Sequence, residues 1–248
     1  DFKYNLAMLN YDEVIAGIEK FKEYDSETLM SVVSEIGRLN EQEVLDSNKI
    51  GDREGLKYVT DGAEGPEVHT PERFKKLYDA VKSSGYVGAT MPTQYGGGGA
   101  PFTTAILAGE IGIAANMAFY MGPGLSHGAM KTILKKATEE LKDKYLPNMT
   151  SGEWMGTMCL TEPQCGTDLG LIKSTAIPKD DYYELTGQKI WISFGEHDLT
   201  ENIIHLVLAR TPDAPEGIKG ISLFLVPKRL DDNSRNTIYC GGLEHKLG

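Results

Sequence analysis

Residues 158–170, MCLTEPQCGTDLG, join an apolar run to a turn that carries hydroxyl groups. Pro163 and Gly166 mark the turn, and Thr161 and Thr167 place hydroxyls on either side of it. At a strand end, backbone N–H groups and hydroxyls can bind the edge of a planar heterocycle or a pyrophosphate without lysine or arginine. Gly166 would let the backbone approach such a ligand closely. On the residues alone, an ordinary strand–loop connection is the favoured interpretation.

The sequence contains no motif typical of a metal site, a serine hydrolase or a nucleotide-binding loop. The five histidines are scattered, none belongs to an HExxH motif, and Cys159 and Cys165 do not form CxxC pairs. No GxSxG motif indicates a serine hydrolase. The glycines at 96–99 lack the spacing of a nucleotide-binding loop and predict a flexible connection. We expect His127 to lie at a helix start near a pocket rather than to act as a general base.

The composition is that of a folded, acidic chain. The 248 residues include 25 Lys or Arg and 36 Asp or Glu, which gives a net charge of −11. Nucleic-acid binding is therefore not expected, because it depends on cationic side chains. Three cysteines are too few for a disulfide framework. Because the first ten residues also lack a secretory signal, we expect a cytoplasmic location of the bacterial type or another reducing compartment.

Two regions of different periodicity must position these residues. Up to about residue 150, apolar residues recur at helical spacing, and residues 49–69 form a polar break that predicts a long loop. The expected helices lie near residues 12–21, 26–39, 70–84, 100–123, 130–134 and 138–145. From residue 151, β-branched runs alternate with turn signals. The expected strands lie near residues 154–160, 173–177, 182–185, 189–193, 203–209 and 221–226.

This pattern predicts an α+β fold. We expect an N-terminal all-α helical domain at residues 1–150, followed by an antiparallel β-barrel or sandwich middle domain at residues 151–248. Residues 100–123 contain Glu110 as their one charged residue. A stretch of about 20 apolar residues can span a bilayer, but a central glutamate makes that costly. We therefore expect a core helix and no membrane span.

Two motifs of the second region resemble those of a known enzyme family. LTEP followed by GTD at residues 160–168, and GQKIWIS at residues 187–193, resemble the flavin motifs of acyl-CoA dehydrogenases. Residues 116–119 and 195–198, NMAF and GEHD, resemble the longer-subunit branch of that family. The resemblance implies that the chain holds the N-terminal and middle domains, and that the C-terminal helical domain of the family is missing from it.

The resemblance implies FAD as the cofactor and gives the matching residues roles. Three residues at the strand end would follow the pyrimidine side of the isoalloxazine, and two after the turn would meet the pyrophosphate. The second motif would cover the ring and reach N5. The residues at the strand end are Met158, Leu160 and Thr161. Those after the turn are Gly166 and Thr167, and those of the second motif are Trp191, Ile192 and Ser193. The expected acyl-CoA contacts are Thr167, Phe119 and Met121, since bulky side chains at the end of the apolar helix would shorten a tunnel.

The activity of the family is α,β-dehydrogenation of an acyl-CoA thioester, with proton removal by a carboxylate and hydride transfer to the flavin. The resemblance places that base beyond Gly248, so we expect this fragment alone to be inactive. The implied substrate is a short-chain acyl-CoA or 3-methylmercaptopropionyl-CoA. The implied partners are electron-transfer flavoprotein and further copies in a homodimer or homotetramer. The alternatives are an acyl-CoA oxidase or nitroalkane-oxidase-like flavoenzyme, and a non-catalytic acyl-CoA-binding or nucleic-acid-binding homologue.

Overall fold

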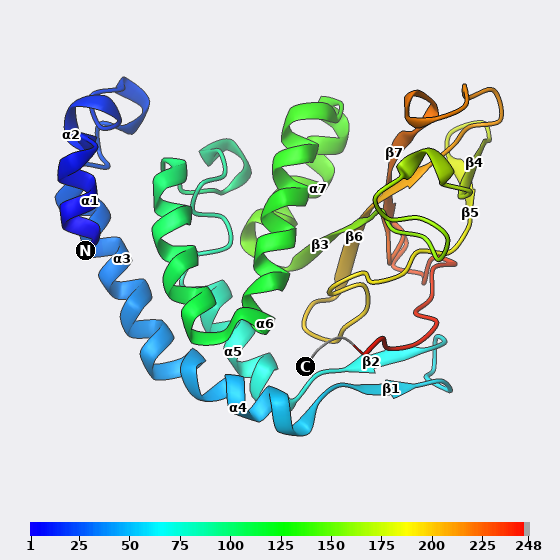
Figure 1. Cartoon of the computed structure of the whole chain (residues 1–248), viewed down its shortest axis with the longest axis horizontal. Helices are drawn as coiled ribbons and strands as arrows, with labels where there is room; N and C mark the ends of the chain where they lie inside the picture. The colour runs from blue at the N-terminus through cyan, green and yellow to red at the C-terminus, as the bar shows by residue number, and fades with distance from the viewer. Residues whose placement is uncertain (246–248) are drawn as a thin grey trace.

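The computed structural model describes residues 1–245, and residues 246–248 of the expected middle domain lie outside that range. A helical half precedes a half built of short sheets, which confirms the predicted α+β fold (Figure 1). The helices are α1 (Phe2–Met8), α2 (Tyr11–Val14), α3 (Ser26–Leu39), α4 (Leu45–Glu54), α5 (Glu72–Ser83), α6 (Phe102–Lys136) and α7 (Glu139–Ser151). The strands are β1 (Lys57–Val59), β2 (Glu67–His69), β3 (Trp154–Cys159), β4 (Thr175–Pro178), β5 (Tyr183–Thr186), β6 (Asn202–Ala209) and β7 (Ser222–Pro227). Shorter helical turns are η1 (Glu19–Phe21), η2 (Asn40–Val44), η3 (Thr93–Tyr95), η4 (Leu169–Leu171) and η5 (Ile218–Gly220).

Helices α3 and α5 form where the apolar spacing predicts them. The carboxylate of Asp25 caps α3 by accepting a hydrogen bond from the N–H of Thr28 at 2.7 Å. Helix α5 begins directly after Pro71, whose fixed φ suits a helix start. The buried residues of both helices belong to the predicted stripes: Leu29, Val33 and Ile36 in α3, and Phe74, Leu77, Tyr78 and Val81 in α5. The stripe of α5 belongs to the main hydrophobic core, and Leu29 and Val33 of α3 belong to a second, smaller cluster with Leu107 of α6.

Helix α6 is the centre of the helical half, and it bends at Asn116. The backbone of Asn116 leaves the helical region (φ −156°, ψ 93°). Its side-chain oxygen accepts a hydrogen bond from the N–H of Phe119 at 3.0 Å, as an N-cap does. Its side-chain nitrogen donates to Oγ of Ser47 in α4 at 2.8 Å. Hydrogen bonds in a buried site therefore fix the bend between the two halves of α6.

By length and composition alone, α6 is the one helix among residues 1–245 that could cross a membrane. One third of its most apolar 18-residue window is buried within this chain. Its first half packs on α3 through Leu107, and its second half packs on β3, where a Cβ on Gly156 would lie 2.7 Å from Ala129. Both halves of α6 therefore pack on other elements of this chain, and the expectation of a core helix without a membrane span stays a prediction.

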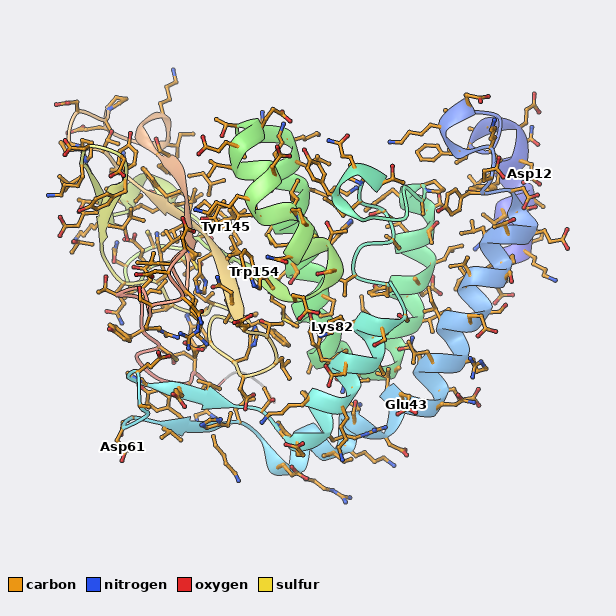
Figure 2. The ribbon with its side chains drawn as sticks, turned by 180° about the vertical axis from the view of Figure 1, so that it is seen from behind. Asp12, Glu43, Asp61, Lys82, Tyr145 and Trp154 are labelled. Atoms are coloured by element: carbon orange, nitrogen blue, oxygen red, sulfur yellow. The ribbon has the colours of Figure 1, made fainter. Side chains whose placement is uncertain are left out.

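The junction between helix α7 and strand β3 fixes the start of the sheet half. Gly152 ends α7 in the left-handed conformation (φ 84°), and its carbonyl accepts a hydrogen bond from the hydroxyl of Tyr78 at 2.7 Å. Figure 2 shows Tyr145 and Trp154 on the two sides of this junction, where their ring centroids are 6.1 Å apart. Strand β3 therefore leaves the helical core in a defined direction.

Helix α7 is longer than predicted. The sequence predicts an end near Tyr145 because Pro147 follows, but the helix continues to Ser151. Proline costs a helix interior about 3 kcal/mol. Leu146 and Met149 are both fully buried, and burial of two such side chains returns about 3–6 kcal/mol. Packing in the core therefore outweighs the local proline penalty.

The helix predicted at residues 12–21 does not form as one element. Helix α2 ends at Val14, and the next helical turn is η1 at Glu19–Phe21. Val14 and Ile18 are 56% and 47% exposed. The apolar stripe there has no core to cover it, so helical spacing alone does not hold the segment in one helix.

The sheets are partly as predicted. Strand β6 pairs antiparallel with β7 and β4 pairs antiparallel with β5, whereas β3 pairs parallel with β6. The parallel pair corrects the wholly antiparallel expectation, because residues 160–201 cross over from the end of β3 to the start of β6. The expected loop at residues 49–69 contains the hairpin β1–β2, which the hydrogen bond from Tyr58 to the carbonyl of Cys240 (2.9 Å) joins to the sheet half.

We expect Asn116→Ala to lower the free energy of unfolding of the full-length protein by about 1–3 kcal/mol, because it removes a cap and a buried hydrogen bond. Urea unfolding measures this change. Asn5→Ala, on the exposed face of α1, is the matched control and should stay within about 0.5 kcal/mol. Equal effects of the two substitutions would contradict the role of Asn116.

Candidate functional site

Two segments far apart in sequence meet at the end of strand β3. The N–H of Ile190 donates to the carbonyl of Thr161 at 2.9 Å, and Nζ of Lys189 donates to the carbonyl of Leu160 at 3.1 Å. The structure therefore brings together the two motifs that the sequence analysis singles out. Met158, Leu160 and Thr161 are all half-buried at this junction.

The carboxylate of Glu162 holds the turn that follows. It accepts hydrogen bonds from Nζ of Lys189 at 2.8 Å, from Oγ of Ser174 at 2.5 Å and from the N–H of Lys173 at 2.7 Å. Burial opposes its ionisation, but these donors outweigh burial and lower the pKa of Glu162 to about 2. Glu162 is 3% exposed. A saturated, buried carboxylate of this kind positions the loop and is unsuited to accept a proton from a ligand.

The turn itself presents polar groups to solvent. Glu162 and Cys165 exchange two backbone hydrogen bonds, of 2.8 Å and 3.0 Å, and close the turn around Pro163. Gly166 and Thr167 follow on the exposed side. Within residues 1–245 their N–H groups have no hydrogen-bond acceptor. Two adjacent N–H groups and a threonine hydroxyl form a donor set suited to phosphate oxygens.

The segment after Ile190 is a loop, which corrects the strand predicted at residues 189–193. Trp191 and Phe194 both adopt left-handed φ values, of 60° and 55°, which a strand cannot contain. The ring of Phe194 packs so closely on α6 that a Cβ at Gly122 would lie 2.6 Å from it. Trp191 remains 44% exposed, and Ile192 and Ser193 are half-buried. The loop therefore turns around an anchored Phe194.

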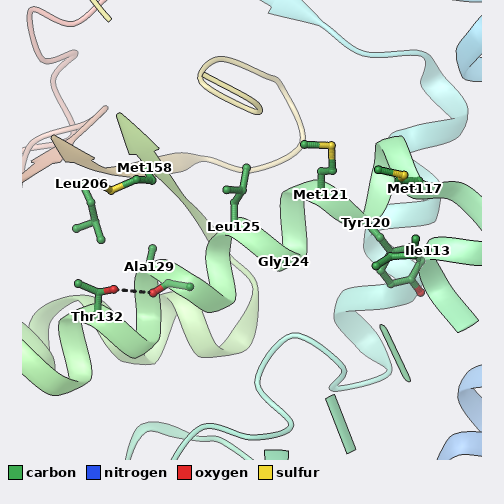
Figure 3. Close-up of a pocket in the computed structure, with 11 residues that line it drawn as sticks. Ile113, Met117, Tyr120, Met121, Gly124, Leu125, Ala129, Thr132, Met158 and Leu206 are labelled. Atoms are coloured by element: carbon green, nitrogen blue, oxygen red, sulfur yellow. Dashed lines mark hydrogen bonds between the residues drawn. The ribbon is translucent and has the colours of Figure 1, made fainter. Parts of the chain in front are cut away.

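An apolar cavity of about 500 Å³ lies beside this junction (Figure 3). A Cβ on Gly124 or Gly128 would meet no atom within 4 Å, so both glycines leave open space in its wall. Met158 on β3 lines one side of it. The other side chains around it are Ile113, Met117, Tyr120, Met121, Leu125, Ala129, Thr132 and Leu206.

Of the three predicted acyl-CoA contacts, only Met121 lies in the wall of this cavity. Met121 lines the cavity, whereas Phe119 is fully buried with its ring 5.8 Å from that of Phe74. Phe119 therefore has a packing role in the core and reaches no cavity. Thr167 lies on the exposed turn, away from the cavity wall. The sequence analysis missed Gly124, Gly128 and Thr132, although their spacing of four residues places them on one helix face.

His205 on β6 is buried next to strand β3. The ring of His205 is 3% exposed, and its Nδ1 lies 2.7 Å from Oγ1 of Thr157. Burial lowers the pKa of His205 to about 4. Cys159 is also buried, which raises the pKa of its thiol. His127 lies in the middle of α6 rather than at a helix start, and it lines a second cavity, as its predicted place near a pocket requires.

Sequence models of the acyl-CoA dehydrogenase family match most of the chain. The model of the N-terminal domain matches residues 57–153, and that of the middle domain matches residues 157–248. The chain is 39% identical to 3-methylmercaptopropionyl-CoA dehydrogenase of Ruegeria pomeroyi over its whole length, which is 42% of that protein. It is 40% identical to a butyryl-CoA dehydrogenase of Syntrophomonas wolfei over 82% of its length and 34% of the relative's.

Solved structures that resemble this chain support the same family. A structure described as electron transferring flavoprotein of Acidaminococcus fermentans has a TM-score of 0.67 and 27% identity, over 82% of this chain and 48% of its own. Acyl-CoA dehydrogenase of Bacillus anthracis complexed with FAD has a TM-score of 0.64 and 25% identity, over 84% of this chain and 32% of its own. The chain belongs to the acyl-CoA dehydrogenase family. It spans less than half the length of the curated relatives named above.

We expect Glu162→Gln to lower the free energy of unfolding by about 3–5 kcal/mol, because it leaves the ammonium of Lys189 buried without its carboxylate. The matched control is Glu184→Gln, since the pair of Glu184 with Lys179 (3.0 Å) is exposed and should be worth less than about 1 kcal/mol. Urea unfolding of the full-length protein compares them. A smaller effect at Glu162 than at Glu184 would refute the anchoring role.

A second expectation concerns pH. Because the pKa of His205 is about 4 in the folded protein and 6.5 for a free imidazole, the unfolded state binds the proton first as the pH falls. The free energy of unfolding should therefore decrease between pH 6.5 and pH 4, by about 3 kcal/mol for this group. His205→Gln should remove that part of the decrease. Below pH 4 both proteins should lose stability alike as Glu162 titrates, and an unchanged slope above pH 4 would contradict the assignment.

Proposed function

We propose that the full-length protein is an FAD-dependent acyl-CoA dehydrogenase that acts on short-chain acyl-CoA thioesters. One observation carries the proposal: Met158 lines the apolar cavity and lies three residues before Thr161, so strand β3 connects an acyl-sized cavity to the junction of the two motifs. The names of the relatives support an acyl-CoA substrate, since they specify 3-methylmercaptopropionyl-CoA and butyryl-CoA.

The donor set at this junction fits FAD. We propose that the N–H groups of Gly166 and Thr167, with the Thr167 hydroxyl, bind the pyrophosphate, and that Leu160 and Thr161 bind the ring edge. Met158 is proposed to lie along the same ring edge. Trp191 is proposed to cover the ring and Ser193 to approach N5, with Ile192 between them. The unpaired N–H groups and the half-buried apolar side chains support these roles. When bound, FAD supplies the acceptor for the hydride that leaves the β-carbon.

The chain's own residues orient the acyl group and exclude water from it. The cavity wall is apolar, and Met117 and Met121 supply polarisable thioethers that pack well on a short or sulfur-containing chain. Removal of the α-proton needs a carboxylate with a free oxygen. The oxygens of Glu162 are occupied by Lys189 and Ser174, and those of Glu196 by Lys228 and Arg235. Neither glutamate is therefore suited to this role, and the resemblance to the family implies a base beyond Gly248.

Electron-transfer flavoprotein is the electron acceptor that we propose. Similarity to the Acidaminococcus fermentans structure supports it. An enzyme of the oxidase type would instead reduce oxygen. Stopped-flow reoxidation of the reduced full-length protein distinguishes the two, because only a dehydrogenase should be reoxidised faster by electron-transfer flavoprotein than by air.

We expect the purified full-length protein to contain FAD and to show its highest kcat/KM with butyryl-CoA or 3-methylmercaptopropionyl-CoA. Octanoyl-CoA and palmitoyl-CoA should be poorer, because the bulky side chains of Met117, Tyr120 and Met121 in the cavity wall should limit the length of the acyl chain. A colourless protein that does not bind added FAD would refute the function. A maximum at octanoyl-CoA or a longer chain would leave the reaction intact and refute the short-chain assignment.

Flavin retention tests the proposed ring contacts. Thr161→Val combined with Trp191→Ala should reduce the FAD content after dialysis, because it removes a polar partner worth about 1–3 kcal/mol and opens the ring face. The matched control is Thr186→Val, on the exposed strand β5. A flavin content equal to that of the unmodified protein would contradict these contacts.

A further inference from the structure

A second, smaller cavity lies on the inner side of α6. Its volume is about 170 Å³, and it is enclosed by α6, by Ile36 of α3 and by the segment from Tyr86 to Thr90. It shares Ile113, Tyr120 and Gly124 with the larger apolar cavity. Gly124 carries no side chain and a Cβ there would meet nothing within 4 Å, so it adds no bulk to the wall that the two cavities share.

The lining of this inner cavity differs from that of the larger one by its polar side chains. Oγ1 of Thr90 lies 2.7 Å from Nε2 of His127, and the ring of Phe102 stacks on the imidazole with centroids 5.9 Å apart. Nζ of Lys131 donates to the carbonyl of Thr90 at 3.0 Å and holds that segment against α6. The imidazole of His127 and the hydroxyl of Thr90 are therefore held in a fixed orientation in the wall of the inner cavity.

Thr104 adds the observation that points to a ligand. It lines the inner cavity and is 2% exposed, and within residues 1–245 its hydroxyl has no hydrogen-bond partner. A buried hydroxyl without a partner is destabilising, because it has lost its hydrogen bonds to water without replacing them. The first turn of α6 thus keeps an unsatisfied polar group beside the Thr90–His127 pair, and a bound polar atom would satisfy it.

The volume of the inner cavity and the charge of its lining residues restrict which ligands it can bind. A cavity of about 150 Å³ can take a benzene-sized molecule, so this one has room for about six non-hydrogen atoms. Burial, and secondly the neighbouring Lys131, lower the pKa of His127, so the imidazole is neutral at neutral pH. A neutral imidazole and two hydroxyls offer hydrogen bonds to an uncharged group rather than a counter-charge to an ion.

We propose that the inner cavity binds the distal end of the acyl chain, and that Thr104 with the Thr90–His127 pair selects chains whose end carries an uncharged hydrogen-bonding group such as a hydroxyl. This inference rests on the proposed function, because it extends the larger cavity as the acyl site. The chain would pass Gly124 and place its last atoms against Thr104. A site that hydrogen-bonds a substrate hydroxyl discriminates against the analogue that lacks it more strongly than an apolar pocket discriminates by size.

The test uses the full-length holoenzyme and two thioesters with equal numbers of non-hydrogen atoms, 5-hydroxypentanoyl-CoA and hexanoyl-CoA. The measured quantity is the ratio of their kcat/KM values, together with the ratio of their dissociation constants from calorimetry. Thr104→Val, which keeps the shape of the side chain, should shift both ratios about five- to tenfold toward hexanoyl-CoA. His127→Phe should shift them in the same direction.

The matched control is Thr103→Val, the neighbouring residue on α6, which lines neither cavity and should leave both ratios unchanged. If both thioesters are oxidised and the ratios do not change in Thr104→Val, the inner-cavity assignment is wrong and the proposed function stands. If neither is oxidised but the binding ratio shifts as expected, the assignment stands and the proposed function is wrong. Equal shifts in Thr103→Val and Thr104→Val would also overturn the assignment, since the effect would not be local to the cavity.

Discussion

Glu162 and Lys189 form an ion pair almost completely removed from water, with side chains 3% and 10% exposed. Such a pair contributes little net stability, because desolvation offsets its attraction, but removing one partner is costly. Its effect is therefore geometric. Lys189 also donates to the carbonyl of Leu160, so one ammonium fixes both the strand end and the turn after it. The donor set at Gly166 and Thr167, and the loop that carries Trp191, take their positions from this contact.

The cavities depend on a second constraint, the shape of α6. Asn116 bends the helix through its own side-chain hydrogen bonds, so the second half of α6 runs along β3 while the first half packs on α3. Small residues on the second half then leave space that larger ones would fill. The acyl-sized cavity and the flavin-type motifs are adjacent because Met158 belongs to the strand that borders both.

Local signals predicted those parts of the fold that local forces decide. The stripes of α3 and α5 could be predicted, because each helix buries one face in an apolar cluster. The end of α7 was not readable, since burial of Leu146 and Met149 decides it and burial depends on the whole fold. The parallel pairing of β3 with β6 joins strands separated by a long crossover, and nothing in the strand sequences specifies its direction. The left-handed turn at Trp191 depends on Phe194 packing against Gly122.

The candidate site also has parts that could be predicted from the sequence and parts that could not. The two motifs could be found because each is a continuous run of residues, whereas their junction joins residues 27 positions apart and the Thr90–His127 pair joins residues 37 positions apart. Neither pair has a spacing that marks it. The inner cavity adds a physical argument that no motif contains: an uncharged polar end group can keep its hydrogen bonds on entering, whereas an apolar end group would leave the hydroxyl of Thr104 without a partner. Selection there would therefore favour neutral polar chain ends over apolar ones.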